Sequence, residues 1–276
     1  MKSIKILVVV LLVGITLGSC SKFAKVEKSK DTEYKLNKAD EYYAKKKYRL
    51  AQQLYESLFP VFKGTQKFED LYYKYAYCFY HQELYSDAEN LFKGYLEVFP
   101  NSPRAEEVDY MRAYSFHKQS PKLELEQVNT VKAMNMMQSF INTHPGSARN
   151  KDAEKIIDES RLKLEQKEFR SAQLYYNLEK FRAAAVAFSN LLNKYPESTS
   201  GEQYKLMVVK AYYRFAKLSV ITRQEERFEK VITEYQDFVD RYPESKYLKE
   251  AAEYDVLSKN QIKEIKNEQI TSSAKQ

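Results

Sequence analysis

The side chains that could carry out chemistry are few in this sequence and are spread along the chain. Its three histidines, His81, His117 and His144, stand in separate stretches. A metal site needs ligands that converge at short spacing, and the sequence has neither an HExxH pattern nor a paired-cysteine arrangement. It also has no glycine-rich phosphate loop, no nucleophile elbow and no carboxylate pair in a distinctive context. The sequence therefore predicts no enzyme activity, no catalytic residue, no metal site and no cofactor.

Cys20 is the residue with the most specific sequence context. Two lysines and a short apolar run, residues 6–13, precede the stretch LGSC that ends at Cys20. An apolar run of this length does not span a bilayer and is typical of a signal peptide. LGSC resembles the bacterial lipobox, whose cysteine is lipidated and becomes the mature N-terminus. We expect residues 1–19 to be a lipoprotein signal peptide and Cys20 to be lipidated; an ordinary secretory signal with a chance cysteine is the alternative.

The residues after Cys20 bear on where the protein is anchored. Ser21 stands where an aspartate would resemble an inner-membrane retention signal, so we expect the outer membrane. Several acyl chains on one residue would anchor the chain firmly. We interpret residues 20–31 as a flexible leash, although the lysine-rich part, residues 22–30, could instead touch anionic headgroups. These residues alone are compatible with repeats that face the periplasm and with repeats that face the cell exterior.

Composition adds two further constraints. The chain has 45 Lys and Arg residues and 38 Asp and Glu residues, and the two signs are interspersed. Solvated helix faces are therefore favoured over a nucleic-acid surface, which would need clustered basic residues. Cys78 shares a helical pattern with Ala76 and Phe79, which indicates a small buried thiol. With Cys20 lipidated, no intramolecular disulfide is possible.

A helical hairpin is predicted between residues 72 and 100, and it defines the repeat of the chain. The first helix carries Ala76, the second carries Ala88 and Phe92, and Pro100 ends the second. Small residues at these places let two helix axes approach closely. The spacing resembles the tetratricopeptide repeat, a unit of about 34 residues with small residues at its eighth and twentieth positions and an aromatic at its twenty-fourth. One such unit cannot bury its own apolar faces, so neighbouring copies are expected.

Five copies can be aligned along the chain. Second helices are marked by Ala51 with Tyr55, Ala88 with Phe92, Ala133 with Met137, Ala184 with Phe188, and Val231 with Tyr235. First helices are marked by Ala39, Ala76, Ala113, Ala172 and Ala211. Four corners share an aromatic residue or histidine, a proline and a serine that could cap the following helix: Ser102, Ser147, Ser198 and Ser245. Pro60 should end the second helix of the first copy early.

The predicted fold is therefore all-α, a right-handed α-solenoid of about five tetratricopeptide-like helix pairs. A long helix without proline or glycine, residues 149–177, bridges the third and fourth copies. We expect N-terminal repeats in residues 32–150, the bridging helix and C-terminal repeats in residues 151–256, and a polar tail in residues 257–276. Copies three and five have a longer gap between their helices, which predicts inserted turns or loops, in the fifth copy at residues 217–227.

An aromatic groove is the candidate binding site. In tetratricopeptide repeats the first helix of each unit lines the concave face. Counted in this way, the groove positions of the second and third copies are Tyr73, Tyr77, Tyr80, His81, Tyr110, Tyr114 and His117. Tyrosine offers a broad contact area and a hydroxyl group, which suits an extended peptide with aromatic or apolar side chains. The alternative is that some of these tyrosines pack between first helices and never meet a ligand.

Several of these features together resemble the BamD family, the lipoproteins of the β-barrel assembly machinery. They are the lipidated cysteine, the five repeats, the bridging helix and the segment EEVDYMRAYSF, residues 106–116. Residues 175–198, YYNLEKFRAAAVAFSNLLNKYPES, are also similar to that family's fourth repeat. The resemblance covers residues 34–256 and implies a protein on the periplasmic face of the outer membrane.

The resemblance also implies two kinds of partner. The N-terminal repeats would receive the C-terminal strand of an unfolded outer-membrane barrel protein, and such strands often end in an aromatic residue. The C-terminal repeats would dock on the periplasmic domains of the central barrel component. That docking surface would fall in the fifth copy, where Tyr212, Arg214 and Phe215 are the candidates. The lipid anchor makes the membrane a third partner, and no nucleic acid is expected.

Two other functions are left open by the sequence. One is a lipoprotein scaffold of the same repeat class that coordinates cell-wall or division machinery. The other is a surface-exposed glycan-binding subunit whose aromatic side chains stack on sugars. The sequence contains no tryptophan, the strongest sugar-stacking residue, and this disfavours the glycan-binding alternative.

Overall fold

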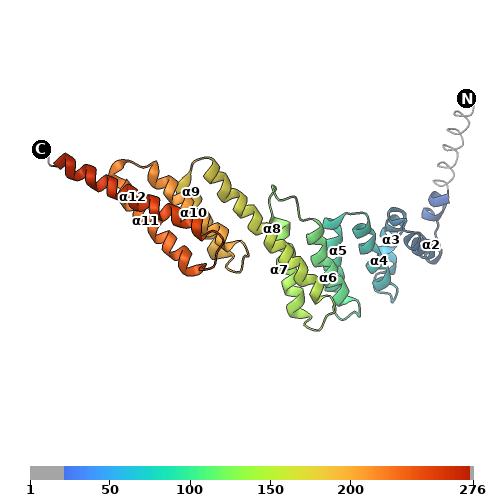
Figure 1. The fold of residues 1–276 in the computed structure, drawn as a ribbon. Coiled ribbons are helices and arrows are strands. Elements are labelled where there is room, and N and C mark those ends of the chain that lie inside the picture. Colours follow the sequence, from blue (N-terminus) through green and yellow to red (C-terminus); the bar gives the residue numbers. More distant parts are fainter. Residues whose placement is uncertain (1–21, 274–276) are drawn as a thin grey trace, which may run out of the picture. The chain divides into compact units, whose positions relative to one another are not determined.

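The structure is a computed structural model that describes residues 22–273, and the described residues contain helices but no strand (Figure 1). The predicted signal peptide and Cys20 lie outside this range. The long helices are α2 (Thr32–Ala44), α3 (Tyr48–Phe62), α4 (Phe68–His81), α5 (Tyr85–Val98), α6 (Ala105–Lys118), α7 (Val128–Thr143), α8 (Asn150–Asn177), α9 (Phe181–Lys194), α10 (Gly201–Lys217), α11 (Ile221–Arg241) and α12 (Leu248–Ser273). No helix among the described residues has an apolar stretch long enough to cross a bilayer.

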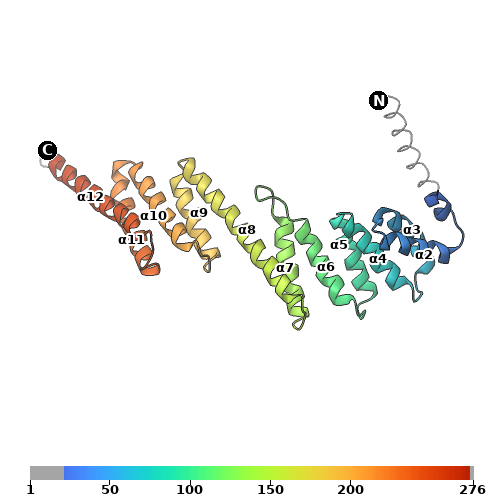
Figure 2. The ribbon, with the colours of Figure 1, turned by 45° about the vertical axis from the view of Figure 1, so that its right-hand side comes forward.

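The chain divides into two compact units within α8, Met1–Ser160 and Arg161–Gln276. In unit 1 each helix from α2 to α7 packs against the next one along the chain (Figures 1 and 2). In unit 2, α10 packs against both α9 and α11, and α12 packs against α11 and also reaches α10. The sequence predicted a boundary between the N-terminal and C-terminal repeats at residue 150, where α8 begins. In the structure the two units divide inside α8, after Ser160.

The small residues that mark the repeats are buried where helices meet. Ala39, Ala76, Ala113, Ala172 and Ala211 on the first helices are at most 1% exposed. Their second-helix counterparts, Ala51, Ala88, Ala133, Ala184 and Val231, are fully buried. Tyr55, Phe92, Met137 and Phe188 are fully buried at the adjoining large position. In the fifth copy Tyr235 is only half-buried, and Phe238 is the fully buried ring instead.

Three copies share one tight turn between their helices. Lys46, Glu83 and Glu179 have positive φ angles of 56°, 62° and 58°, in the left-handed region. The backbone N–H that follows each of them closes the turn by donating to a carbonyl of the preceding helix. These are the copies with the shorter gap, so equal spacing in sequence corresponds to one turn geometry.

Each of the four corner serines makes at least two hydrogen bonds through its side-chain hydroxyl group. Each Oγ accepts the backbone N–H two residues later, at Arg104, Arg149, Ser200 and Tyr247, over 3.0 to 3.1 Å. Each hydroxyl also donates to a glutamate on an earlier helix: Ser102 to Glu69, Ser147 to Glu106, Ser198 to Glu165 and Ser245 to Glu202. The expectation that these serines cap the next helix is therefore corrected. They cap the turn before it and join neighbouring repeats.

The bridging helix is confirmed, because α8 runs without interruption from Asn150 to Asn177. The extra residues of the third copy form a connection between α6 and α7, residues 119–127, as expected. In the fifth copy the extra residues form inserted helical turns, which is one of the two expected forms, and not a loop. Only residues 218–220 connect α10 to α11, and the extra residues lengthen α11 at its start. The Gln224 side chain donates to the Ser219 carbonyl there and stabilises the first turn of the longer helix.

Pro60 does not end α3, which continues to Phe62. Proline removes one backbone donor, and the carbonyl that loses its partner belongs to Glu56. Pro60 and Glu56 both lie on the exposed side of α3, so water can bind this carbonyl. The buried residues Leu58 and Phe62 hold the helix end in place on the opposite side.

The terminal segments differ from the expectation of a leash and a tail. Residues 22–27 are helical and Val26 is 5% exposed, so the described part of the leash is folded. At the other end, α12 continues to Ser273, well beyond the boundary expected at residue 256. Ile262 and Ile265 of this segment belong to a cluster with Val209, Tyr213 and Phe228 of α10 and α11. Ile262 and Ile265, three residues apart in an otherwise polar tail and so on one face of a helix, were the sequence signal for this packing.

Candidate binding surfaces

The aromatic groove positions come from α4 and α6, the first helices of the second and third copies. Glu69 and Asp70 in the first turn of α4, and Glu106 and Glu107 in that of α6, favour the start of each helix through its dipole. Histidine or lysine in the last turn favours its end, at His81 and at His117 and Lys118. Charges at both ends therefore favour the observed first and last residues of the two helices that carry the rings.

The seven predicted side chains are joined by a continuous series of ring contacts. We call these seven side chains the aromatic network. The distances between ring centroids are 4.6 Å for Tyr73–Tyr77, 6.2 Å for Tyr77–Tyr80, 5.6 Å for Tyr80–His81, 6.4 Å for Tyr80–Tyr114, 5.7 Å for Tyr110–Tyr114 and 5.4 Å for Tyr114–His117. The contact between Tyr80 and Tyr114 joins α4 to α6, so the two repeats share one aromatic surface.

The members of the network differ in burial. Tyr77 and Tyr110 are 8% and 7% exposed and belong to the core of unit 1. His81 is exposed, and the remaining members are half-buried: Tyr73, Tyr80, Tyr114 and His117. Tyr77 and Tyr110 thus pack between helices, as the alternative interpretation held for some of the tyrosines. The other five rings have faces or edges that a ligand can reach.

Tyrosines of second helices also join the network. Tyr48 of α3 stacks on His81 with centroids 4.3 Å apart and an interplanar angle of 17°. Tyr85 of α5 lies 5.5 Å from Tyr80, and the Lys118 ammonium is 5.8 Å from the Tyr85 ring. Sequence reasoning missed both, because it counted groove positions on first helices only.

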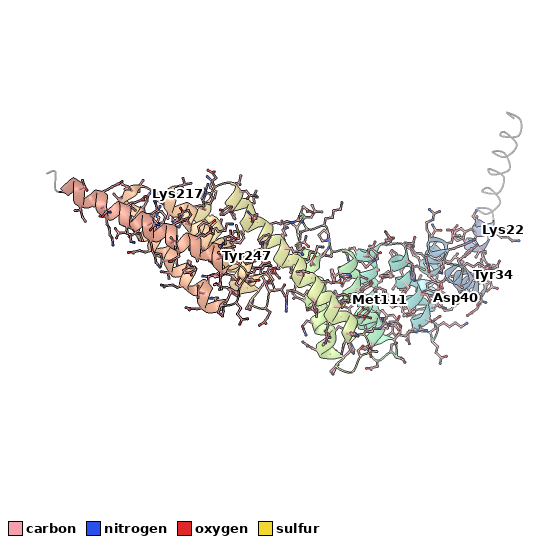
Figure 3. The ribbon with its side chains drawn as sticks, in the orientation of Figure 1. Lys22, Tyr34, Asp40, Met111, Lys217 and Tyr247 are labelled. Atoms are coloured by element: carbon pink, nitrogen blue, oxygen red, sulfur yellow. The ribbon has the colours of Figure 1, made fainter. Side chains whose placement is uncertain are left out.

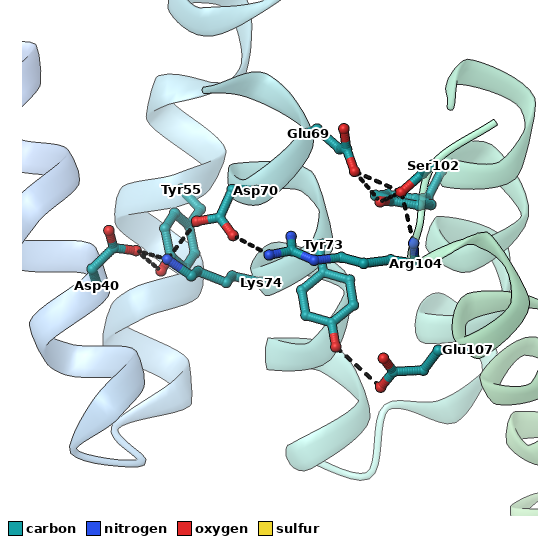
Figure 4. A network of polar contacts seen from close by, with 10 residues as sticks. Asp40, Tyr55, Glu69, Asp70, Tyr73, Lys74, Ser102, Arg104 and Glu107 are labelled. Carbon is teal, nitrogen blue, oxygen red and sulfur yellow. Dashed lines mark hydrogen bonds and ion pairs between the residues drawn. The ribbon is translucent and has the colours of Figure 1, made fainter. Parts of the chain in front are cut away.

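Glu107 of α6 holds two of the hydroxyl groups in place. Tyr77 and Tyr73 both donate to Glu107 Oε1, over 2.6 Å and 3.1 Å. The Arg104 guanidinium lies 4.4 Å from the Tyr73 ring (Figure 4 shows Tyr73, Arg104 and Glu107). Burial raises the pKa of Tyr77, and so does its bond to the carboxylate, so the phenol stays protonated as a donor. The polar contacts fix the rings at this end of the network.

A row of charges continues from this point to α2 (Figure 4). Arg104 pairs with Asp70 over 2.9 Å, and Lys74 bridges Asp70 and Asp40 over 2.5 and 2.9 Å. Tyr55 donates to the same Asp40 oxygen over 2.6 Å. Partial burial would raise the pKa of Asp70, but the bonds from Lys74 and Arg104 outweigh it and the pKa lies below its usual range. The row ties the first helices of three successive copies together.

The spacing of these polar pairs is the signal that sequence reasoning overlooked. Tyr73 and Glu107, Asp40 and Lys74, and Glu33 and Lys67 are each separated by 34 residues. That separation is the length of one tetratricopeptide unit. Residues one unit apart face each other on neighbouring first helices, so complementary polar types at this spacing predict contacts between repeats.

Two members of the network that a ligand can reach, Tyr80 and His81, offer hydrogen bonds. Burial raises the pKa of Tyr80 to about 12, so its hydroxyl group remains protonated near neutral pH. Burial, together with the nearby Lys46 charge, lowers the pKa of His81. Neutral imidazole and phenol groups can stack on aromatic side chains and donate or accept hydrogen bonds. The surface is suited to binding a peptide rather than to proton transfer.

The candidate docking residues lie together on α10 of unit 2, each beside a cation or an aromatic ring. The Arg227 guanidinium is 4.1 Å from the Phe215 ring, and the Lys230 ammonium is 5.6 Å from the Tyr212 ring. Arg214 is exposed and its guanidinium lies 5.2 Å from the Phe181 ring. Such contacts stabilise the rings while leaving charged groups at the surface.

Two pockets meet at these residues. The first, of about 690 Å³, is mainly apolar and is lined by Tyr175, Glu179, Lys180, Phe181, Arg182, Ala183, Val186, Ala187, Asn190 and Phe215. The second, of about 660 Å³, is mainly charged and is lined by Arg182, Tyr212, Phe215, Arg223, Glu226, Arg227, Glu229, Lys230 and Thr233. Arg182 and Phe215 belong to both. The sequence indicated only the α10 part of this surface, because α9 and α11 are brought to it by packing.

The remaining histidine has a structural contact. His144 Nε2 lies 3.2 Å from Asp109 Oδ2, and its ring lies 4.9 Å from that of Phe140. Among the residues that the structure describes, no group of His, Cys, Asp and Glu side chains could hold a metal ion.

The surfaces described above can be placed in a family. A family model described as YfiO, outer membrane lipoprotein, matches residues 28–226. The chain belongs to this family. The match includes all of the aromatic network and most of the candidate docking surface. It places the chain among outer membrane lipoproteins, the class that the N-terminal motif had predicted.

No curated protein sequence matches the chain. Among solved structures, the TPR2AB-domain:pHSP90 complex of yeast Sti1 matches with a TM-score of 0.39 and 13% identity, over 83% of this chain and 98% of that chain.

Proposed function

We propose that this outer membrane lipoprotein is a BamD-type scaffold of the β-barrel assembly machinery, anchored through Cys20 on the periplasmic face. It binds unfolded barrel proteins with unit 1 and the central barrel component with unit 2, and it has no chemistry of its own. The observation that carries the proposal is the aromatic network, a single surface shared by two repeats and half exposed. The family supports the location in the outer membrane.

The substrate is proposed to be the C-terminal strand of an unfolded barrel protein. Five network rings are reachable, and Tyr80 and Tyr114 meet at the centre of the network. An extended peptide that ends in an aromatic residue can stack its ring there and hydrogen-bond to the neighbouring hydroxyl groups. Tyr77 and Tyr110 support this surface from the core.

The test is the affinity of such a peptide for a variant with Tyr80→Ala and Tyr114→Ala. Each ring supplies on the order of 1 kcal/mol, so binding should weaken by at least about tenfold. The matched control is Tyr34→Ala with Tyr175→Ala, because both of these tyrosines are exposed and outside the network. Circular dichroism verifies that both variants keep their helices. Equal affinities of the two folded variants would overturn the peptide-binding assignment.

The partner of unit 2 is proposed to be the periplasmic part of the central barrel component. Arg182 and Arg214 are exposed at the docking surface, so Arg182→Glu with Arg214→Glu reverses its charge without opening the core. A tagged purification from detergent-solubilised outer membranes should recover a large barrel protein with wild type and lose it with this variant. The matched control, Arg49→Glu with Lys63→Glu, changes exposed residues of unit 1 and should retain it. Recovery of wall-linked proteins or a sugar transporter instead would contradict the proposal.

A further inference from the structure

The segment directly before α2 is folded onto the first repeat. Residues 22–27 are helical, and Val26 belongs to the buried cluster that contains Leu36 and Ala39 of α2. The Phe23 ring lies 5.9 Å from that of Tyr42. The segment is therefore fixed to α2 by its apolar side chains.

The junction to α2 is closed by hydrogen bonds. Ser29 Oγ accepts the backbone N–H of Asp31 over 3.2 Å. Asp31 Oδ1 in turn accepts the N–H of Tyr34 over 2.9 Å and caps the start of α2. Hence the path of the chain is defined on both sides of residues 28–31.

This packing shortens the distance between the first repeat and a lipid on Cys20. A leash from residue 20 to residue 31 could extend to about 40 Å, whereas the two residue steps from Cys20 to Lys22 span at most about 7 Å. An acyl chain on Cys20 would therefore enter the bilayer close to Lys22. This step rests on the proposed lipidation of Cys20.

The face next to that anchor is positively charged. Residues 22–30 contain four lysines and one glutamate, Glu27. Lys22, Lys25, Lys28 and Lys30 are exposed, and within the described residues none of them makes an ion pair. The acidic groups at the start of α2 are engaged, because Asp31 caps the helix and Glu33 pairs with Lys67 over 2.5 Å. Lys22 lies at the same end of unit 1 as Tyr34 of α2 (Figure 3).

We propose that these four lysines form a membrane-contact surface that binds anionic phospholipid headgroups and holds the first repeat on the bilayer. Phe23 and Val26 fix the segment to α2, so the lysines are presented as part of the folded unit. Several cations beside a lipid anchor are attracted by the negative surface potential of an anionic leaflet, and this attraction weakens with salt. The anchor and the lysines would act together as two signals.

The test measures vesicle binding by the mature chain, residues 20–276, with Cys20→Ser so that no lipid contributes. Sedimentation should show binding to vesicles of phosphatidylglycerol and phosphatidylcholine and little binding to phosphatidylcholine alone. The variant Lys22→Gln, Lys25→Gln and Lys28→Gln should bind the anionic vesicles at least about tenfold more weakly.

The matched control removes the same charge from the far end of unit 1, where the helices from α2 to α7 have packed one after another away from the segment. Its changes are Lys122→Gln, Lys132→Gln and Lys151→Gln, all at exposed residues, and its vesicle binding should stay within about twofold of wild type. Equal losses in the two triple variants, or absence of binding to anionic vesicles by the parent chain, would overturn the proposal. Mass spectrometry of the N-terminal peptide from wild-type membranes tests lipidation separately, so failure of the anchor is distinguishable from failure of the lysine surface.

Discussion

Cys78 shows how strongly position within a repeat controls the reactivity of one residue. It lies on α4 and is completely buried in the cluster of unit 1 that also contains Leu54, Leu58 and Leu71. Burial raises the pKa of its thiol to about 12, and the thiolate is the reactive form. At about pH 8 only about one molecule in ten thousand would carry the thiolate, even before steric protection is considered.

We therefore expect Cys78 to be inert in the folded protein. In the mature chain with Cys20→Ser, an aromatic disulfide reagent at about pH 8 should label almost no thiol under native conditions and one thiol per chain in denaturant. Labelling in low denaturant should rise together with opening of unit 1. Rapid, complete labelling of the native chain would show that the α4 core is open or that the thiol is activated.

At the residue scale, the sequence identified buried alanines better than it identified polar partners. Ala76 and Ala88 could be placed because small size at a fixed spacing is visible in one stretch of chain. Asp40 and Lys74 could not be paired from local pattern, because their contact exists only once two repeats have stacked. Burial similarly separates Tyr77 from Tyr80, although the two are three residues apart and were grouped together from the sequence.

At the element scale, a buried cation joins α10 to α11. Lys205 is 3% exposed, and its Nζ pairs with Glu234 and lies 2.5 Å from Asp237 Oδ2. Lys230 and Arg241 also pair with these carboxylates, over 2.6 and 2.9 Å. Burial would raise the pKa of Glu234, but the bonds from Lys205 and Lys230 outweigh it and the pKa lies below 4.5.

Replacing Lys205 by Met should destabilise unit 2 by about 2–4 kcal/mol at neutral pH, because two carboxylates lose a buried partner. The free energy of unfolding from denaturant titration is the measurement. Lys266→Met is the matched control, since Lys266 pairs with Glu225 at the surface with 54% of its side chain exposed. Its effect should stay below about 1 kcal/mol. Similar effects of the two substitutions would contradict a special role for the buried lysine.

The same substitution should change how stability depends on pH. The pKa values of Glu234 and Asp237 lie below their usual 4.5 and 3.8 in the folded chain. Their contribution is therefore fully present above the unfolded values and is lost as the pH falls through the folded ones. In Lys205→Met both folded values move back up, so the loss of stability between about pH 5 and pH 2 should be shallower than in wild type. An unchanged slope would mean that Lys205 does not set these pKa values.

At this scale, most helices could be predicted from the helical spacing of apolar residues. The bridging helix α8 was expected within one residue of its start, because neither proline nor glycine interrupts its pattern. Errors arose where packing outweighed a local signal. Pro60 stays inside α3 because buried neighbours hold the helix end. The extra residues of the fifth copy are helical in the first part of α11, where Phe228 is fully buried.

At the scale of the whole molecule, stability is expected to be local. In a repeat protein each helix pair contacts its neighbours only, so stability is a sum of repeat and interface contributions. The division within α8 agrees with this, since one buried cluster of unit 1 includes Ala153 and Ile157, and one of unit 2 includes Ala172. The sequence indicated the repeats but placed the last boundary too early, since α12 belongs to the core of unit 2.

Two matched core deletions test whether the units respond separately. Phe188 on α9 and Phe92 on α5 are both fully buried, so each Phe→Ala substitution should cost about 3–5 kcal/mol within its own unit. Hydrogen exchange followed by mass spectrometry should show faster exchange in α9 and α10 for Phe188→Ala, with α2 to α5 unchanged. Phe92→Ala should give the reverse pattern, with faster exchange in α4 to α6. If either substitution accelerated exchange equally in both units, the chain would unfold as one cooperative body and the nearest-neighbour account would fail.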